Sequence, residues 1–145
     1  MKALVQRVSS AKIEIDGKIT GAIEQGILVF LGLEKADEKP QVDKIIKKIL
    51  SYRIFADEEK KMNLSVKDIG GAVLVVSQFT LAADTKSGSR AGFSTAKPPA
   101  AAKVLYDYFL TQLKNSYPLV ESGIFGADMQ VSLCNDGPVT FLLEC

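Results

Sequence analysis

The most informative absence in this sequence of 145 residues is histidine, of which there is none. Histidine is the commonest general base at neutral pH and a common metal ligand, so its absence excludes a Ser-His-Asp triad. The two cysteines, Cys134 and Cys145, lack C-x-x-C spacing. They are interpreted as reduced thiols, with Cys134 in a strand, although a disulfide between them is possible. No zinc or other metal site and no cofactor is expected.

The sequence also lacks long apolar runs and a dominant charge. Its longest apolar run, 27–31, is far shorter than the ~20 residues of a membrane span, and residues 1–7 contain no apolar signal core, so a cytoplasmic protein without a membrane partner is expected. The net charge is +1, from 18 basic and 17 acidic residues. Any contact with RNA must therefore be local. Length and composition predict one domain over residues 1–145.

Apolar periodicity predicts a mixed α/β protein. Asp16-Gly17 is typical of a hairpin turn, and the run 27–31 is typical of a strand buried on both faces. Apolar residues spaced three and four apart predict one helix over 40–52 and a second that begins near Pro98-Pro99, with loops over 57–68 and 84–97. Strands are predicted over residues 2–8, 11–15, 19–23, 27–31, 72–76, 119–125, 129–134 and 139–143. This order predicts a sandwich in which helices cover a mixed sheet.

The apolar face of the second helix follows from the same spacing. Its predicted members are Ala101, Val104, Leu105, Tyr108, Phe109 and Leu113.

The first candidate site is Ser77-Gln78-Phe79-Thr80-Leu81, directly after a predicted buried strand. Strand ends in α/β proteins hold side chains in place while leaving them accessible, so two hydroxyls, an amide and an aromatic ring could form a site there. The same hydroxyls could instead serve only to form hydrogen bonds with nearby backbone groups. With no histidine available, Lys86 is the remaining candidate base for a nucleophilic Ser77 or Thr80.

The second candidate is Asn135-Asp136-Gly137-Pro138-Val139-Thr140. Asn, Asp, Gly and Pro together are typical of a hairpin turn. A Gly-Pro bond can also be cis at a cost of only ~0.5–1 kcal/mol. Gly137-Pro138 would then present bare carbonyl oxygens on a stiff backbone, which suits close approach to a ligand.

The third candidate is the basic segment 84–103, which contains one acidic residue, Asp84, and four basic residues. The basic residues are Lys86, Arg90, Lys97 and Lys103. Glycines and Phe93 are interleaved with these charges. Such a loop could hold a phosphodiester backbone or a single-stranded end, and it could equally be an ordinary solvated loop.

The first two candidates, in this order and at this separation, resemble the D-aminoacyl-tRNA deacylase family. Val5-Gln6-Arg7-Val8 is similar to the family's opening strand, and the length agrees, so the resemblance covers essentially the whole chain. One departure is visible. The family usually has Arg-Pro before the loop phenylalanine, where this sequence has Arg90-Ala91-Gly92-Phe93.

The resemblance implies a homodimeric, layered α/β/β enzyme that hydrolyses the ester between a D-amino acid and the 3′-terminal adenosine of tRNA. It implies that Gly137-Pro138 is cis and reaches into the partner subunit's pocket, where it faces Ser77–Thr80. Arg7 is expected to hold the Gly-Pro segment, and Ala102 to line the pocket. The catalytic segment consists of Ser77, Gln78, Phe79 and Thr80.

The implied mechanism uses no protein nucleophile. Water would attack with help from the 2′-hydroxyl of the substrate, Ser77 and Gln78 would orient the reactants, and amides near Phe79 and Thr80 would form an oxyanion hole. Carbonyls of Gly137 and Pro138 would bind the α-ammonium and exclude an L side chain, so glycyl-tRNA is predicted to be cleaved. Two alternatives stay open: a hydrolase of small esters or amides, and a non-enzymatic module that binds RNA or a small ligand.

Overall fold

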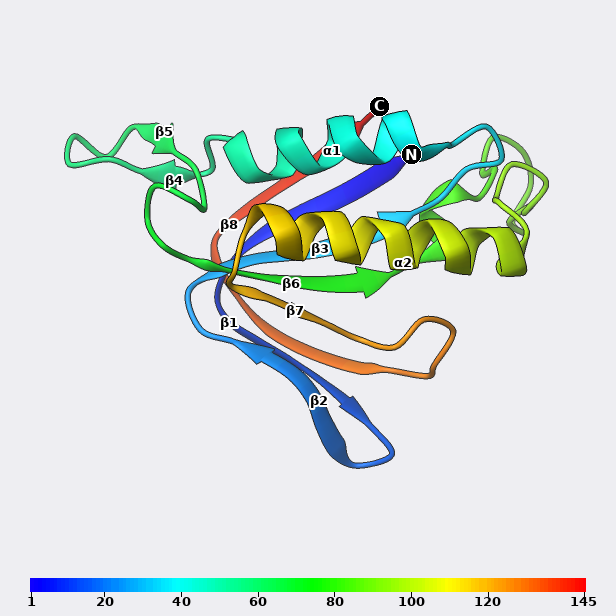
Figure 1. Cartoon of the computed structure of the whole chain (residues 1–145), viewed down its shortest axis with the longest axis horizontal. Helices are drawn as coiled ribbons and strands as arrows, with labels where there is room; N and C mark the ends of the chain where they lie inside the picture. The colour runs from blue at the N-terminus through cyan, green and yellow to red at the C-terminus, as the bar shows by residue number, and fades with distance from the viewer.

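A mixed six-stranded sheet forms the centre of the molecule, which a computed structural model describes over residues 1–145 (Figure 1). The strand order is β2-β1-β3-β6-β7, and β8 pairs with the free edge of β1. The pairs β3–β6 and β6–β7 are parallel, and all pairs of β1 are antiparallel. The strands are β1 (Lys2–Ile15), β2 (Lys18–Ile23), β3 (Gly26–Gly32), β6 (Ala72–Ser77), β7 (Val120–Ser122) and β8 (Gln130–Glu144).

Two helices, α1 (Lys39–Ser51) and α2 (Pro99–Ser116), cover one face of this sheet (Figure 1). The larger hydrophobic core lies between these helices and the sheet, and a smaller core lies on the opposite face. The smaller core joins Leu28 and Leu74 of the central strands to Ile13 and Ile23, where β1 and β2 bend across the sheet. The predicted mixed α/β sandwich is therefore confirmed.

The central strand β3 shows why the run 27–31 is so apolar. Ile27, Val29 and Leu31 face the helices, Leu28 faces the smaller core, and β3 has partners on both edges. The helix predicted over 40–52 is also confirmed as α1, whose buried residues are Val42, Ile45, Ile46, Ile49 and Leu50. None of the helices is long and apolar enough to span a membrane.

Three predictions of local structure were wrong. The separate strands predicted over 2–8 and 11–15 are the single strand β1, and those over 129–134 and 139–143 are parts of β8, because the two long strands pair with each other along their length. The loop predicted over 57–68 contains β5 (Met62–Leu64), which pairs with β4 (Phe55–Ala56). The strand predicted over 119–125 is only the three-residue β7.

The predicted apolar face of α2 was correct for Leu105, Phe109 and Leu113 and wrong for Ala101 and Val104. Val104 is 70% exposed and Ala101 is exposed, whereas Ala102 and Tyr106 are buried. The buried residues of α2 are Ala102, Leu105, Tyr106, Phe109 and Leu113.

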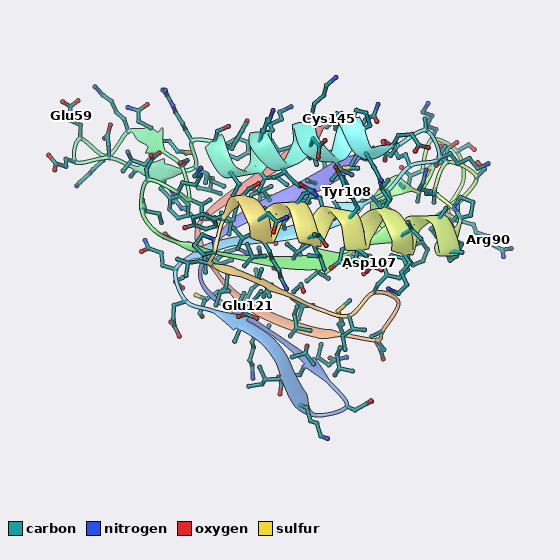
Figure 2. The ribbon with its side chains drawn as sticks, viewed as in Figure 1. Glu59, Arg90, Asp107, Tyr108, Glu121 and Cys145 are labelled. Carbon is teal, nitrogen blue, oxygen red and sulfur yellow. The ribbon has the colours of Figure 1, made fainter.

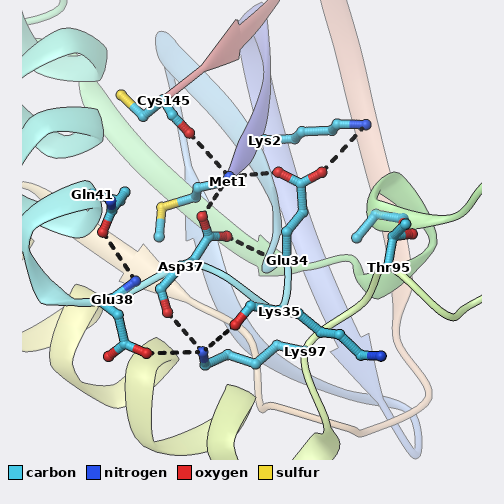
Figure 3. Close-up of polar contacts among 11 residues, drawn as sticks. Met1, Lys2, Glu34, Lys35, Asp37, Glu38, Gln41, Thr95, Lys97 and Cys145 are labelled. Carbon is cyan, nitrogen blue, oxygen red and sulfur yellow. Dashed lines mark hydrogen bonds and ion pairs between the residues drawn. The ribbon is translucent and has the colours of Figure 1, made fainter.

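A buried ion-pair network joins the start of β1 to the segment before α1 (Figure 3). The α-ammonium of Met1 lies 2.7 Å from carboxylate oxygens of Glu34 and Asp37, and it also donates to the carbonyl of Cys145. Burial alone would lower the pKa of this amino group, but its hydrogen bonds with Asp37 and Glu34 outweigh burial and raise the pKa. The same contact lowers the pKa of Glu34. The network therefore ties both chain ends to the entrance of α1.

Replacing Asp37 with asparagine is expected to lower the free energy of unfolding by about 3 kcal/mol, because it breaks a buried ion pair and leaves the Met1 α-ammonium with one carboxylate. Urea unfolding measures the change. Glu59→Gln is the matched control, since Glu59 forms an exposed pair with Lys61 and should change stability by no more than about 0.5 kcal/mol. Equal stabilities of the two variants would contradict the assigned role of Asp37.

Candidate active site

A cavity of about 770 Å³ lies where the end of β6, the start of α2 and the connection from β7 to β8 meet. This volume is in the range of small-molecule binding sites. Its lining is mostly apolar and includes Ser77, Gln78, Phe79, Phe93, Ala102, Tyr106, Phe125 and Met129. The cavity therefore brings together three of the five residues of the first candidate segment and Ala102.

The Ser77–Thr80 segment lies at the edge of this cavity because β6 ends there. Ser77 is the last residue of β6, the amide of Gln78 donates to the carbonyl of Leu31 at 2.8 Å, and Phe79 begins the 3₁₀-helix η1 (Phe79–Ala82). Gly32 permits this turn, since a Cβ there would lie 2.8 Å from Cβ of Leu81. The strand end thus presents Ser77, Gln78 and Phe79 to the cavity on a fixed backbone.

The hydroxyl of Thr80 has a different environment. Thr80 is exposed, does not line the cavity, and accepts a hydrogen bond from Nε2 of Gln78 at 2.5 Å. No hydrogen bond joins Lys86 to Thr80 or to Ser77; only the backbone amide of Lys86 is engaged, with Asp84. The rival hypothesis of a Ser77 or Thr80 nucleophile with Lys86 as base therefore has no hydrogen bond to support it in this structure.

Aromatic residues form much of the cavity wall, and two of them, Tyr106 and Phe125, were not predicted as site residues. Phe79 and Phe93 pack with ring centroids 5.1 Å apart, and Tyr106 packs on Phe125 at 5.5 Å. Tyr106 could have been found only with the correct phase of α2. Phe125 belongs to a segment whose alternation predicted a strand, although it lies in the connection from β7 to β8.

The segment Asn135–Thr140 is a bulge inside β8 and not a hairpin turn, so the turn interpretation was wrong. Gln6 of β1 pairs with Thr140 and Val8 pairs with Asn135, which leaves four residues of β8 opposite the single residue Arg7. The extra residues arch out of the ladder, and both Gly137 and Pro138 are exposed. Their peptide bond is cis.

The side chain of Arg7 holds this bulge in place through hydrogen bonds. Its Nε donates to the carbonyl of Asp136 at 2.8 Å and lies 3.4 Å from Oδ2 of the same residue, while Nη1 donates to the carbonyl of Ile54 at 2.9 Å. Gly137 has φ of 139°, and a Cβ there would lie 2.8 Å from Val139 and 3.2 Å from Nη2 of Arg7. Glycine is thus required at this position.

The two candidate segments do not meet within one chain. Arg7, Gly137 and Pro138 are absent from the lining of the cavity that contains Ser77 and Phe79. The first cluster lies at the carboxyl end of β6, and the second lies midway along the β1–β8 pair.

Only part of the predicted basic segment is available for binding. Lys97 is 10% exposed, donates to the carbonyls of Lys35 and Asp37, and lies 3.6 Å from Glu38 (Figure 3). Lys103 pairs with Asp107 at 2.6 Å. Lys86 and Arg90 form no ion pair and are exposed in the loop before α2, where Arg90 extends from the periphery of the molecule (Figure 2).

Comparison with known proteins places these features in a family. The family model described as D-Tyr-tRNA(Tyr) deacylase matches residues 4–144. The D-aminoacyl-tRNA deacylases of Stutzerimonas stutzeri (strain A1501) and Pseudomonas syringae pv. syringae (strain B728a) are each 58% identical over 144 residues, which are 99% of this chain and 99% of each relative.

Two solved structures have the same fold. The c-Myc DNA Unwinding Element Binding Protein is 42% identical with a TM-score of 0.96, over 100% of this chain and 99% of that one. A probable eukaryotic D-amino acid tRNA deacylase is 16% identical with a TM-score of 0.83, over 98% and 97%. The chain is a hydrolytic enzyme with a layered α/β architecture. It belongs to the D-Tyr-tRNA(Tyr) deacylase family, as its resemblance predicted.

Proposed function

We propose that this enzyme hydrolyses the ester between a D-amino acid and the 3′-terminal adenosine of tRNA, and that it rejects L-aminoacyl-tRNA. The observation that carries the proposal is the pairing of two features: an aromatic cavity with Ser77, Gln78 and Phe79 at its edge, and an exposed backbone bulge at Gly137-Pro138. The names of the curated relatives support the same substrate class.

The active unit is a homodimer in this proposal. β8 is a 15-residue edge strand, since it pairs only with β1, and its Leu133 and Leu142 are 36% and 51% exposed. Long exposed edge strands with apolar side chains are covered in native proteins. A second copy that covers β8 would carry its own Gly137-Pro138 bulge to the neighbouring cavity and complete a site that one chain leaves in two parts.

The backbone of the bulge would distinguish D-aminoacyl from L-aminoacyl substrates. D and L isomers carry the same groups, so an enzyme must fix three substituents of the α-carbon and block the fourth direction. The carbonyls of Gly137 and Pro138 would accept hydrogen bonds from the α-ammonium. The arch, stiffened by Arg7, would leave no space on the side where an L side chain projects. Glycine has no side chain to exclude, so glycyl-tRNA would also be cleaved.

The chemical step would use water and the substrate itself. A water oxygen attacks the ester carbonyl, the 2′-hydroxyl of the terminal ribose relays a proton, and the bond to the 3′-oxygen breaks as that oxygen gains a proton. Backbone amides near Phe79 and Thr80 would stabilise the oxyanion, and Ser77 and Gln78 would orient the ester. This division of roles requires no histidine.

The tRNA partner would be contacted locally, in agreement with the net charge of +1. Lys86 and Arg90 are exposed in the loop before α2, form no ion pair, and would contact phosphates of the acceptor end. A cytoplasmic location is proposed with this substrate, because aminoacyl-tRNA is made and used there.

Replacing Thr80 with alanine is expected to leave kcat/KM for D-tyrosyl-tRNA within about threefold of the wild type, because Thr80 is exposed, lies outside the cavity and has no base. Steady-state release of tyrosine measures the effect. A drop of 1,000-fold or more in a folded variant that still binds tRNA would restore Thr80 as a nucleophile.

Time courses on three substrates test the proposed function: D-tyrosyl-tRNA, L-tyrosyl-tRNA and D-tyrosine ethyl ester. Rapid loss of the first alone supports a deacylase that needs both the D configuration and the nucleoside. Rapid loss of the ethyl ester would indicate a general esterase, and stoichiometric binding without turnover would indicate a binding module.

A further inference from the structure

Three charged side chains line the cavity beside β6 and α2: Lys35, Lys97 and Asp128. The ammonium of Lys97 is engaged, because it donates to two backbone carbonyls at 3.1 and 2.7 Å and lies 3.6 Å from Glu38. The ammonium of Lys35 forms neither a hydrogen bond nor an ion pair within the protein, and Figure 3 shows it extending away from the network around Lys97. Lys35 is therefore the one cation on the cavity wall that is free to bind a ligand.

The backbone at Lys35 is held in place although its side chain is free. Its amide donates to the carbonyl of Thr95 at 3.0 Å, and its carbonyl accepts the hydrogen bond from Lys97 at 3.1 Å. Thr95 and Lys97 lie just before α2, so these two bonds join the segment after β3 to the entrance of that helix. The Lys35 side chain thus starts from a fixed point on the cavity wall, and only its methylene chain has to be ordered when a ligand binds.

The acidic residues nearest to Lys35 in the chain have other partners. Glu34 and Asp37 both bind the α-ammonium at the start of the chain, each at 2.7 Å. Glu38 lies beside the other lysine of the lining. Asp128, the only carboxylate in the lining, comes from the connection between β7 and β8 and forms no ion pair. The cavity therefore has an unpaired positive charge at Lys35, and its unpaired negative charge comes from a different segment.

This distribution of charge favours an anionic group at Lys35. Under the proposed function, the end of the substrate that enters the cavity carries two charges: the α-ammonium, and the phosphodiester on the 5′-oxygen of the terminal nucleotide. Lys35 would repel the α-ammonium and attract the phosphodiester, and a lysine ammonium is a common phosphate ligand. Lys86 and Arg90 do not line the cavity, so they are available only to phosphates farther along the tRNA.

We propose that Lys35 is a substrate-binding residue whose ammonium pairs with the phosphodiester between the last two nucleotides of the tRNA. This inference rests on the proposed function for its substrate. It adds a phosphate-binding position to the site, apart from the groups at Ser77–Phe79 and Gly137-Pro138 that act on the ester and the α-ammonium. Because Lys35 is exposed to solvent, the pair is strongest at low ionic strength.

Two ligands that differ by one phosphate test the inference: adenosine, and adenosine 5′-(methyl phosphate), a diester with a single negative charge. In calorimetric titrations at low salt, we expect the wild-type enzyme to bind the diester about fivefold more tightly than adenosine. Lys35→Gln should keep the affinity for adenosine and lose this preference, whereas Lys35→Arg should retain it. The thermal midpoint of Lys35→Gln should not change, since the side chain forms no bond within the protein.

Lys44→Gln is the matched control, because it removes one exposed and unpaired lysine charge on α1, outside the cavity lining. It should keep the preference for the diester. In steady-state assays at low salt, KM for D-tyrosyl-tRNA should rise about fivefold in Lys35→Gln while kcat stays within about twofold, and Lys44→Gln should resemble the wild type. In about 0.5 M salt the difference between the two variants should largely disappear.

Each other outcome of the titrations overturns the inference. Equal affinity of the wild-type enzyme for the two ligands would show that no phosphate is bound beside the nucleoside. A preference that survives in Lys35→Gln would assign the phosphate to another group, and a preference lost equally in Lys44→Gln would show only the general field of the protein. The titrations need no turnover. A wild-type enzyme that prefers the diester through Lys35 but does not cleave D-tyrosyl-tRNA would refute the proposed function and support the phosphate-binding position.

Discussion

Replacing Gly137 with alanine is expected to lower kcat/KM for D-tyrosyl-tRNA by about 100-fold or more. The residue has φ of 139°, and an added Cβ would lie 2.8 Å from backbone and side-chain atoms of Val139 and 3.2 Å from the Arg7 guanidinium. The arch must therefore shift, and a displacement of about 1 Å at a reacting centre costs about 10²-fold in rate. Steady-state hydrolysis measures the loss, with circular dichroism to verify folding.

Gly17→Ala is the matched control for this substitution. Gly17 also has a positive φ, 75°, but its Cβ would meet nothing within 4 Å, and it lies in the hairpin between β1 and β2. Both substitutions should cost about 1–3 kcal/mol of stability from backbone strain. Only Gly137→Ala should lose activity. Similar kinetics for the two variants would show that the shape of the arch does not matter to the reaction.

A D-tyrosyl-tRNA whose terminal ribose lacks the 2′-hydroxyl is expected to react about 10²- to 10⁴-fold more slowly in kcat, because the proposed proton relay is lost. KM should change little, since the base and the α-ammonium keep their contacts. Single-turnover hydrolysis of the deoxy and ribose substrates measures the ratio. Equal rates would show that a protein group activates the water, and the search for that group would return to Ser77 and Gln78.

The sequence pattern predicted correctly those strands and helices in which the burial of each residue follows from the spacing of apolar residues nearby in the chain. The run 27–31 is buried on both faces, and Val42 to Leu50 form one face of α1, so their spacing was sufficient. For α2 it was not. Two adjacent faces of this helix are apolar, and only packing against the sheet and the cavity decides that Tyr106 is buried while Val104 is 70% exposed.

The candidate site was predicted in part for the same reason. Ser77 ends β6 and Phe79 follows it, and the apolar run before them indicates this strand end, where the structure places both residues at the cavity. The bulge at Gly137 has the composition of a turn, and only the continued pairing of β8 with β1 on both sides of it excludes a chain reversal. Phe125 and Met129 come from the connection after β7, whose contribution to the cavity depends on contacts distant in sequence.

The missing histidine is explained by a site of this kind. Gly137 and Pro138, held by the Arg7 side chain, present backbone carbonyls, and Ser77 and Gln78 lie at the cavity edge. Neither cluster contains a side chain whose ordinary pKa is near neutrality. In the proposed mechanism, the protein selects and orients the substrate, and the RNA transfers the proton.

The most direct test of L side-chain exclusion compares hydrolysis of glycyl-tRNA and L-alanyl-tRNA on the same tRNA body, because the two substrates differ by one methyl group. If the Gly137-Pro138 arch excludes the L side chain by its shape, the enzyme will cleave glycyl-tRNA and leave L-alanyl-tRNA intact over the same time course. Cleavage of both at similar rates, or of neither while D-alanyl-tRNA is cleaved, would contradict selection by backbone exclusion.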